Sequence, residues 1–354
     1  MPSQKQLMKG AEAIAEAAIR AGCRHFFGYP ITPQNEIPEY MSKRLPEVGG
    51  VYLQAESEVA SINMIFGGAS TGARVLTSSS SPGVSLMSEG ASYLVGAELP
   101  AVIVNIMRGG PGLGDIAPSQ SDWSMMTKGW GHGDKRYISL CPATVQEAVD
   151  MMSLAFDLAE KYRNPVVLLG DGLLGQMMEP VIFPALSEIA PEQSWAARGK
   201  LATRPRVIVR SLYLDPAELE RHVDHLYDKF ARMEREEPRA ETWMCDDEPP
   251  VLVCAFGTVA RIAKTAIGKL RGEGLRVGLW RPMTAWPFPV ESLQKAAATS
   301  DRLLSIEMNK GQMVEDIRAV IGHDKPVGFW GRSGGMVPTV DEMMNAIRGQ
   351  FANA

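Results

Sequence analysis

Three stretches of the sequence place chemically active side chains directly after apolar runs that are typical of strands. Thr32 lies between Pro30 and Pro33 in the segment GYPITP, Glu58 follows LQAES, and Arg108 precedes GGPGLG. A hydroxyl can bind a substrate, a carboxyl can share a proton, and a guanidinium can bind a carboxylate. Because the carboxyl ends of parallel strands meet at one edge of a sheet, the three residues are expected to share one pocket.

The segment GYPITP, residues 28–33, is predicted to be a stiff loop between a short strand at 25–27 and a helix at about 35–45. Each proline restricts its own backbone and disfavours a helical conformation in the residue before it. Thr32 is therefore expected to be extended, with its hydroxyl held in one direction. A rigid connection that binds nothing explains this loop equally well when it is taken alone.

Glu58 lies at the start of a predicted helix that follows a strand at 51–54 and runs to about residue 67. A glutamate in the first helical turn usually complements the helix dipole, which is worth about a few tenths of a kcal/mol. That explanation suits Glu56. Because apolar and small residues follow Glu58, its carboxyl is expected to face a packed surface, where it can share or donate a proton.

Four serines, residues 78–81, end the predicted strand 74–77, and a helix is expected over residues 84–95. Serines in this position either satisfy the free N–H groups of the helix or bind a polar ligand there. Capping would explain one serine rather than four, so the run weakly favours a ligand site.

Arg108 leaves the buried parallel strand predicted at 100–106 and enters a loop made mostly of glycine and proline. In this position the guanidinium is suited to bind an oxyanion or a carboxylate. An ion pair with a neighbouring carboxylate such as Asp115 is an equal alternative from this stretch alone.

The whole chain is predicted to be an α/β protein with two parallel-sheet domains, because strands and helices alternate over most of its 354 residues. The expected boundaries are 1–185 for the first domain, 186–249 for a charged linker or arm, and 250–354 for the second domain. The net charge of −5 argues against a nucleic-acid or membrane partner. The four scattered cysteines predict no zinc or iron–sulfur site in this chain and suit a reducing cytoplasm, and no segment reaches transmembrane length.

Taken together, these motifs resemble the α-type subunits of the 2-oxoacid:ferredoxin oxidoreductases. GYPITP resembles the family's YPITP signature, and the segments QAESEVASINM, TSSSSPGVSLMSEG and RGGPG follow in the family's order. The resemblance spans nearly the whole chain. It implies that residues 1–185 form the pyrimidine-binding domain of a thiamine diphosphate enzyme and that residues 250–354 form a transketolase C-terminal-like domain.

The resemblance also implies roles for individual residues. Glu58 matches the glutamate that hydrogen-bonds N1′ of the aminopyrimidine and favours its imino tautomer, which can take the thiazolium C2 proton. Thr32 matches a threonine that contacts the substrate, and Arg108 matches the arginine that binds the 2-oxoacid carboxylate. The resemblance further predicts cofactor contacts for the remaining residues of these loops, namely Pro30, Ile31, Ser81 and Pro82.

The two glycine-containing loops depart from the TSGPG and RGGPST sequences of many 2-oxoglutarate-type relatives. They are similar instead to the branched-chain, 2-oxoisovalerate subunits, and Leu113 would suit an apolar substrate tail. The implied reaction is oxidative decarboxylation of a 2-oxoacid with coenzyme A to acyl-CoA and CO₂, with electrons passing to ferredoxin. A 2-oxoglutarate or pyruvate oxidoreductase subunit, a redox-neutral thiamine transferase half such as a split transketolase, and a non-catalytic scaffold are the alternatives.

The chain lacks parts that such an enzyme requires. Gly170-Asp171-Gly172 resembles the start of a motif for Mg²⁺ and diphosphate, but no asparagine occurs between Asn164 and Asn309 to complete it. The resemblance therefore implies that a β-type partner subunit holds Mg²⁺ and the diphosphate end. It also implies cluster-bearing and γ-type subunits with [4Fe–4S] clusters, in a dimer of heteromers.

Overall fold

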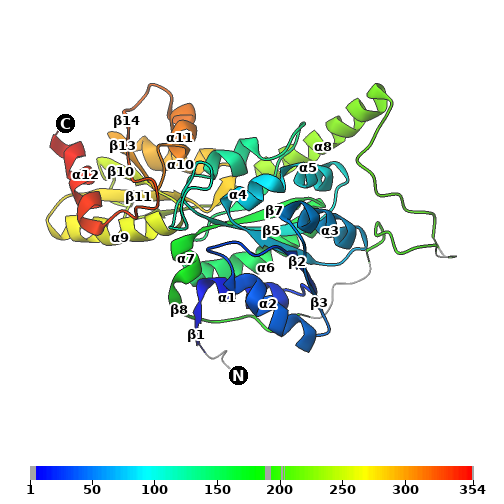
Figure 1. Ribbon diagram of the computed structural model, residues 1–354. Helices are drawn as coiled ribbons and strands as arrows, with labels where there is room; N and C mark the ends of the chain where they lie inside the picture. The colour runs from blue at the N-terminus through cyan, green and yellow to red at the C-terminus, as the bar shows by residue number, and fades with distance from the viewer. Residues whose placement is uncertain (1–4, 188–192, 201, 203, 353–354) are drawn as a thin grey trace.

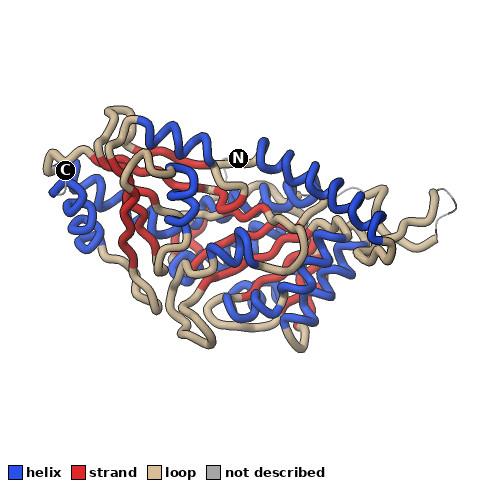
Figure 2. The backbone as a smooth tube through the Cα atoms, turned by 90° about the horizontal axis from the view of Figure 1, so that it is seen from above, coloured by secondary structure: helices blue, strands red, loops and turns tan. Residues whose placement is uncertain are grey.

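The computed structural model describes residues 5–187, 193–200, 202 and 204–352, and it confirms an α/β fold with two parallel sheets (Figure 1). Helices cover both faces of each sheet, as the view from above also shows (Figure 2). The apolar strands explain this arrangement, because a strand such as β5 (Ala101–Met107), in which every residue is buried, needs cover on both sides.

The first sheet has seven strands, of which six are parallel and the edge strand β12 is antiparallel to its neighbour. Their order is β12 (Thr284–Trp286), β6 (Ile138–Leu140), β7 (Pro165–Asp171), β5, β4 (Val75–Ser79), β2 (His25–Gly28) and β3 (Val51–Gln54). The strand β12 comes from the second half of the sequence, so the sheet joins segments that are more than a hundred residues apart.

The helices of the first domain form two groups. One group consists of α1 (Gly10–Arg20), α2 (Glu36–Glu47) and α6 (Val145–Tyr162), and the short helix α7 (Gly172–Gln176) contacts α1. The other consists of α3 (Glu58–Ser70), α4 (Ser81–Leu86) and α5 (Ser88–Gly96). The helix predicted over 84–95 is thus two helices that meet at Met87. The predicted loop at 115–136 contains a π-helical turn, η1 (Met125–Gly129).

Apolar residues recur at helical spacing from Leu7 and predict a helix over residues 7–21, but the predicted start was wrong. Residues Gln6–Lys9 form strand β1, which pairs antiparallel with β8 (Met178–Val181), and α1 begins only at Gly10. A side chain at Gly10 would overlap the Leu174 carbonyl, so the helix begins where the chain passes close to α7. The strand pairing with β8 explains why the apolar spacing near residue 7 wrongly predicted a helix there.

The second sheet has five strands, four of them parallel. Their order is β14 (Val327–Gly331), β13 (Arg302–Glu307), β10 (Val251–Cys254), β11 (Val277–Pro282) and the antiparallel β9 (Ala240–Trp243). Four helices pack on it: α9 (Gly257–Gly272), α10 (Val290–Ala298), α11 (Met313–Ile321) and α12 (Val340–Ala352). The strand β9 belongs to the stretch predicted as an arm, and it extends this sheet.

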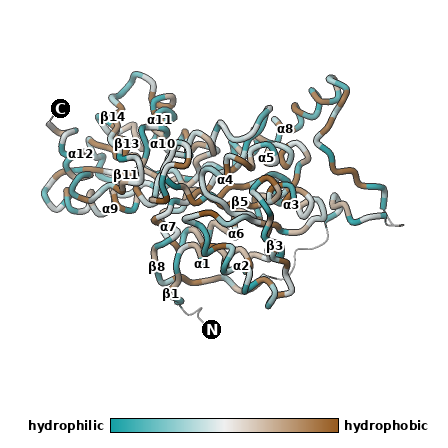
Figure 3. Tube along the Cα trace, in the orientation of Figure 1, coloured by the Kyte–Doolittle hydropathy of each residue, from teal (hydrophilic) through white to brown (hydrophobic). Residues whose placement is uncertain are grey.

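The charged helix of the arm is α8 (Pro216–Glu236), capped by Asp215, whose side chain accepts a hydrogen bond from the Ala217 N–H. Leu226, Phe230 and Met233 are buried on one side of α8. Figure 3 shows hydrophilic and hydrophobic residues alternating along this helix. The helix therefore rests on the body of the protein by one face.

A buried arginine connects the two sheets and the arm. The Arg281 side chain on β11 is 2% exposed, and it forms ion pairs with Glu147 of α6 and Glu241 of β9. The Glu147 carboxylate also accepts a hydrogen bond from the Ala143 N–H, 2.9 Å away, and Thr144 caps the same helix. These contacts fix the second domain against the first.

Within the described part of the chain, no helix combines the length and the apolar character that crossing a bilayer requires.

Candidate active site

The order of the first sheet brings the predicted site loops together. Strands β5, β4 and β2 are neighbours and parallel, so the loops that follow them leave from the same edge. These segments are the loop 29–35, Ser80 with the first turn of α4, and the loop 108–118, and α3 begins beside them after β3. Parallel sheets commonly place ligands at such an edge.

The Arg108 guanidinium contacts the loop 29–35 and a later part of its own loop. Its Nη1 donates a hydrogen bond to the Thr32 carbonyl at 2.9 Å, and its Nη2 donates to the Leu113 carbonyl at 3.2 Å. The residue is 8% exposed, and its buried Nε has no hydrogen-bond acceptor. The guanidinium is thus held by two backbone carbonyls, while N–H groups remain that an anion could use.

Arg108 and Asp115, both in the part of the chain that the structure describes, do not form the alternative ion pair. The Asp115 Oδ1 instead accepts a hydrogen bond from the Ala117 N–H within its own loop, at 2.9 Å. Arg108 therefore has no carboxylate partner within the described chain. This arrangement favours the interpretation that its charge serves a bound anion.

Glu58 begins α3 and is 5% exposed. The helix is capped by Ser57, whose Oγ accepts a hydrogen bond from the Ala60 N–H, so Glu58 is not required as a cap. A methyl group added at Gly83 would overlap both the Glu58 Oε1 and the Ser79 Oγ. The carboxylate therefore faces the first turn of α4, and no described residue donates a hydrogen bond to it. It is available to a ligand.

The four serines do not cap α4 with their side chains. Ser80 is the residue at the N-cap, yet its hydroxyl makes no capping bond, and the buried hydroxyls of Ser79 and Ser80 have no partner among the described residues. Ser78 Oγ donates to the Gln34 Oε1 at 2.5 Å. Unpaired buried hydroxyls are costly, which indicates that this turn serves more than helix capping.

Ser81 is held by a carboxylate that the sequence motifs did not single out. The Ser81 Oγ donates to the Asp122 Oδ2 at 2.6 Å, and the same oxygen accepts from the Asn105 Nδ2 at 2.9 Å. Burial raises the pKa of Asp122, although these two hydrogen bonds act in the opposite direction. Asp122 lies in an irregular loop, where no periodicity or motif could mark it.

The remaining predicted residues lie at the same edge but are more exposed. Pro30 is exposed, and Ile31 and Pro82 are half-buried. Leu113 is 84% exposed, so its carbonyl contacts Arg108 while its side chain contacts solvent. The Arg108 side chain thus contacts the backbone carbonyls of Thr32 and Leu113, whereas no contact between the three side chains is needed for this arrangement.

Asp171 of the Gly-Asp-Gly segment has a role in the fold. Its Oδ1 accepts hydrogen bonds from the Leu173 and Leu174 N–H groups, and its Oδ2 accepts from the Thr258 Oγ1 at 2.5 Å. Burial raises its pKa. The carboxylate therefore caps α7 and ties it to the start of α9. The described residues contain no group of His, Cys, Asp or Glu side chains arranged to bind a metal ion.

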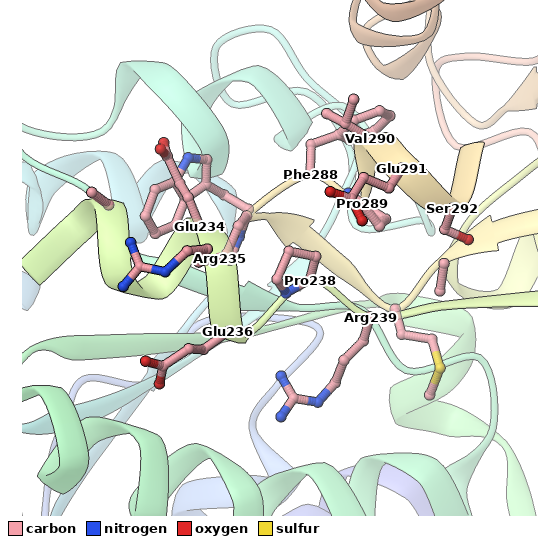
Figure 4. A pocket seen from close by; sticks show the side chains of 15 residues that line it. Glu234, Arg235, Glu236, Pro238, Arg239, Phe288, Pro289, Val290, Glu291 and Ser292 are labelled. Atoms are coloured by element: carbon pink, nitrogen blue, oxygen red, sulfur yellow. The ribbon is translucent and has the colours of Figure 1, made fainter. Parts of the chain in front are cut away.

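A groove of about 1140 Å³ lies elsewhere, between the end of α8 and residues 283–292 (Figure 4). Arg235, Arg239 and Phe288 are among the side chains that line it, and none of the predicted site residues does.

Three large apolar side chains near the site residues in the sequence are exposed to solvent. Val59 is 45% exposed, Leu86 is 56% exposed, and Ile116 is 63% exposed. They follow Glu58, the serine turn and Arg108 respectively in the sequence.

Comparison with protein families gives matches over most of the chain. Residues 16–240 match the family described as "Pyruvate flavodoxin/ferredoxin oxidoreductase, thiamine diP-bdg". Residues 250–343 match "Pyruvate:ferredoxin oxidoreductase core domain II".

Individual relatives cover nearly the full chain. The ketoisovalerate oxidoreductase subunit VorB of Methanothermobacter thermautotrophicus is 47% identical over 344 residues, 97% of each chain. The 2-oxoglutarate synthase subunit KorA of the same organism is 35% identical over 373 residues, 98% of each chain.

Solved structures agree in fold. A 2-oxoglutarate:ferredoxin oxidoreductase from Magnetococcus marinus, with 2-oxoglutarate, coenzyme A and succinyl-CoA bound, has a TM-score of 0.89 and 28% identity. The match covers 98% of this chain and 65% of that longer chain. An inactive split-gene transketolase, with a TM-score of 0.60 and 14% identity, shares the fold alone.

Proposed function

The chain belongs to the thiamine-binding 2-oxoacid:ferredoxin oxidoreductase family, and we propose that it is the α-type subunit of a branched-chain member of that family. The proposed reaction converts a 2-oxoacid and coenzyme A to acyl-CoA and CO₂. The two electrons released reduce two ferredoxins, one electron each. The observation that carries the proposal is the contact of Arg108 with the carbonyls of Thr32 and Leu113, beside the buried carboxylate of Glu58.

The residues at this edge fit the aminopyrimidine end of thiamine diphosphate. The Glu58 carboxylate is buried and lacks a donor within the described chain, so a ring N–H can satisfy it. The unpaired hydroxyls of Ser79 and Ser80 lie on the adjacent turn. When bound, thiamine diphosphate supplies the carbon nucleophile and the electron sink for decarboxylation. In the proposed site Glu58 holds the proton shared with ring nitrogen N1′.

Arg108 is proposed to bind the carboxylate of the 2-oxoacid. Its two carbonyl contacts fix the plane of the guanidinium, and its free Nε–H can donate to a carboxylate oxygen. The Thr32 hydroxyl is proposed to contact the same substrate, and Pro30, Ile31, Ser81 and Pro82 to contact the cofactor. The backbone of Thr32 thus helps to place Arg108 while its side chain faces the substrate.

The charge of the three loops favours a substrate with one carboxylate. Arg108 is the one basic residue in residues 28–35, 78–86 and 107–116, and Asp115 adds a negative charge nearby. A second substrate carboxylate, as in 2-oxoglutarate, would find no cation in these segments and would be repelled by Asp115. The exposed side chains of Leu113 and Ile116 suit an apolar tail, as in 2-oxoisovalerate.

The rest of the machinery is assigned to partner subunits. Both oxygens of Asp171 are used by α7 and Thr258, which supports a diphosphate and Mg²⁺ site on a β-type partner. The [4Fe–4S] clusters are assigned to cluster-bearing and γ-type subunits, with ferredoxin as the acceptor, in a dimer of heteromers. All four cysteines are free thiols, which suits a reducing cytoplasm.

Purification of the chain with its partners tests this proposal. We expect a brown complex that absorbs near 400 nm and reduces ferredoxin or a viologen only when a 2-oxoacid, coenzyme A and thiamine diphosphate are all present. A colourless complex that transfers a two-carbon unit between sugars would instead indicate a transketolase half. A complex whose rate does not depend on this chain would indicate a scaffold.

A further inference from the structure

Residues 119–123 connect the second domain to the site. Gln120 donates from Nε2 to the Phe256 carbonyl at 2.9 Å and from its backbone N–H to the Met308 carbonyl at 3.0 Å. Trp123, which is fully buried, donates from Nε1 to the Asp316 Oδ2 at 2.7 Å. This stretch of the first domain is therefore bonded to the residues that follow β10 and β13 and to α11 of the second domain.

Asp122 faces the opposite way from its neighbours. Its side chain is directed to the first domain, where Oδ2 accepts hydrogen bonds from Ser81 and from Asn105. Asp122 is 8% exposed, Ser81 is 8% exposed and Asn105 is fully buried. Hydrogen bonds to a buried charged acceptor are short and strong, so they can set positions accurately.

Ser81 continues the chain of hydrogen bonds to Arg108. Its Oγ donates to Asp122 and accepts from the Arg108 backbone N–H at 3.1 Å. Asn105, the other donor to Asp122, lies three residues before Arg108 near the end of β5. Two separate contacts therefore join Asp122 to the strand end that carries the arginine.

We propose that Asp122 is a positioning residue that sets the place of Arg108, and through it the substrate carboxylate, relative to the second domain. The inference rests on the proposed function of Arg108. The second domain holds residues 119–123 in place through its hydrogen bonds to Gln120 and Trp123. Asp122, in the same stretch, in turn holds the strand end that carries the substrate-binding arginine. The position of the arginine matters because the substrate carboxylate is proposed to bind to its N–H groups.

Two substitutions at Asp122 separate hydrogen bonding from charge. Asp122→Asn can keep both hydrogen bonds, because a single oxygen accepts them, whereas Asp122→Ala removes both. In the assembled complex we expect Asp122→Ala to raise the KM for the 2-oxoacid at least about tenfold, with kcat changed by less than about threefold. We expect Asp122→Asn to stay within about threefold of wild type with an unchanged pH profile. Asp134→Ala, an exposed acid of the same region, is the matched control.

A double substitution tests whether Asp122 acts through Arg108. In an Arg108→Lys complex, Asp122→Ala should raise KM by less than about threefold further, because the group that it positions has already been changed. If the Asp122→Ala complex does not fold, Ser81→Ala removes one of the two contacts between Asp122 and the strand end of Arg108 and leaves the one through Asn105, so it should raise KM in the same direction by a smaller factor.

Four results would overturn the inference: an unchanged KM in Asp122→Ala, an unchanged KM in Ser81→Ala, equal damage from Asp122→Asn and Asp122→Ala, or a full tenfold effect in the Arg108→Lys complex. Failure of the proposed function is a different outcome, because the wild-type complex itself would then not oxidise 2-oxoacids.

Discussion

Substitution of Gly83 by alanine tests whether the Glu58 carboxylate must lie where the structure places it. The new methyl group would overlap both the Glu58 Oε1 and the Ser79 Oγ, whereas ordinary contact begins at 3.4 Å. One or both oxygens must therefore move by about 1 Å, and a displacement of that size can cost about 100-fold in rate. Gly83 lies within α4 and its φ is not in the left-handed region, so alanine suits its backbone.

The expected effect on stability is small. Overpacking costs about 1–3 kcal/mol, and replacing glycine by alanine within a helix returns up to about 1 kcal/mol. We therefore expect a destabilisation of about 0–3 kcal/mol together with a loss of about 100-fold in 2-oxoacid-dependent viologen reduction. Gly67→Ala on α3 is the matched control, because a methyl group there meets no atom within 4 Å. It should leave activity unchanged and stabilise the helix slightly.

The assay compares kcat/KM and the thermal midpoint of the three complexes in parallel. Wild-type activity in Gly83→Ala, with an unchanged midpoint, would show that the position of Glu58 does not govern the reaction. Equal loss in Gly67→Ala would show that the effect comes from the helices in general.

Two further predictions follow from named side chains. Glu58→Gln should lower kcat by about 100-fold or more, as expected for a group that shares a proton, whereas Glu56→Gln should have little effect, and unchanged turnover in Glu58→Gln would support a scaffold role. Arg281→Met should lower the free energy of unfolding by about 3 kcal/mol, because Glu147 and Glu241 lose a buried partner but keep some access to water. Burial alone would raise the pKa of Glu241, but hydrogen bonds from Lys264 and Arg281 outweigh it and lower the pKa below 4.5. The ion pairs of Glu241 therefore stabilise the fold above pH 4.5 and are lost on acidification. The difference in the free energy of urea unfolding between wild type and Arg281→Met should therefore become smaller as the pH falls below 4.5. A difference that stays constant with pH would contradict this.

The local pattern of the sequence was sufficient to predict the parallel sheets and the loops that follow their strands. Pro30 and Pro33 marked a rigid strand-end loop, and the apolar run before Arg108 marked the buried strand β5. The sheet order then brought these loops together. The general rule for parallel strands predicted this edge without any knowledge of which strands are neighbours.

The features that the sequence did not reveal depend on contacts between distant residues. Strand β1 exists because β8 pairs with it, and β12 crosses to the first sheet although its sequence lies in the second domain. Asp122 is separated by 41 positions from Ser81, its hydrogen-bond partner. No periodicity in an irregular loop could indicate that contact, since it arises only when the second domain fixes residues 119–123.

The substrate preference of the purified complex tests the central claim most directly. We predict that ferredoxin or viologen is reduced with a higher kcat/KM for 2-oxoisovalerate than for 2-oxoglutarate, because Arg108 is the single cation in the three site loops. A higher value for 2-oxoglutarate would contradict the branched-chain assignment, and no reduction with any 2-oxoacid would contradict the proposed function itself.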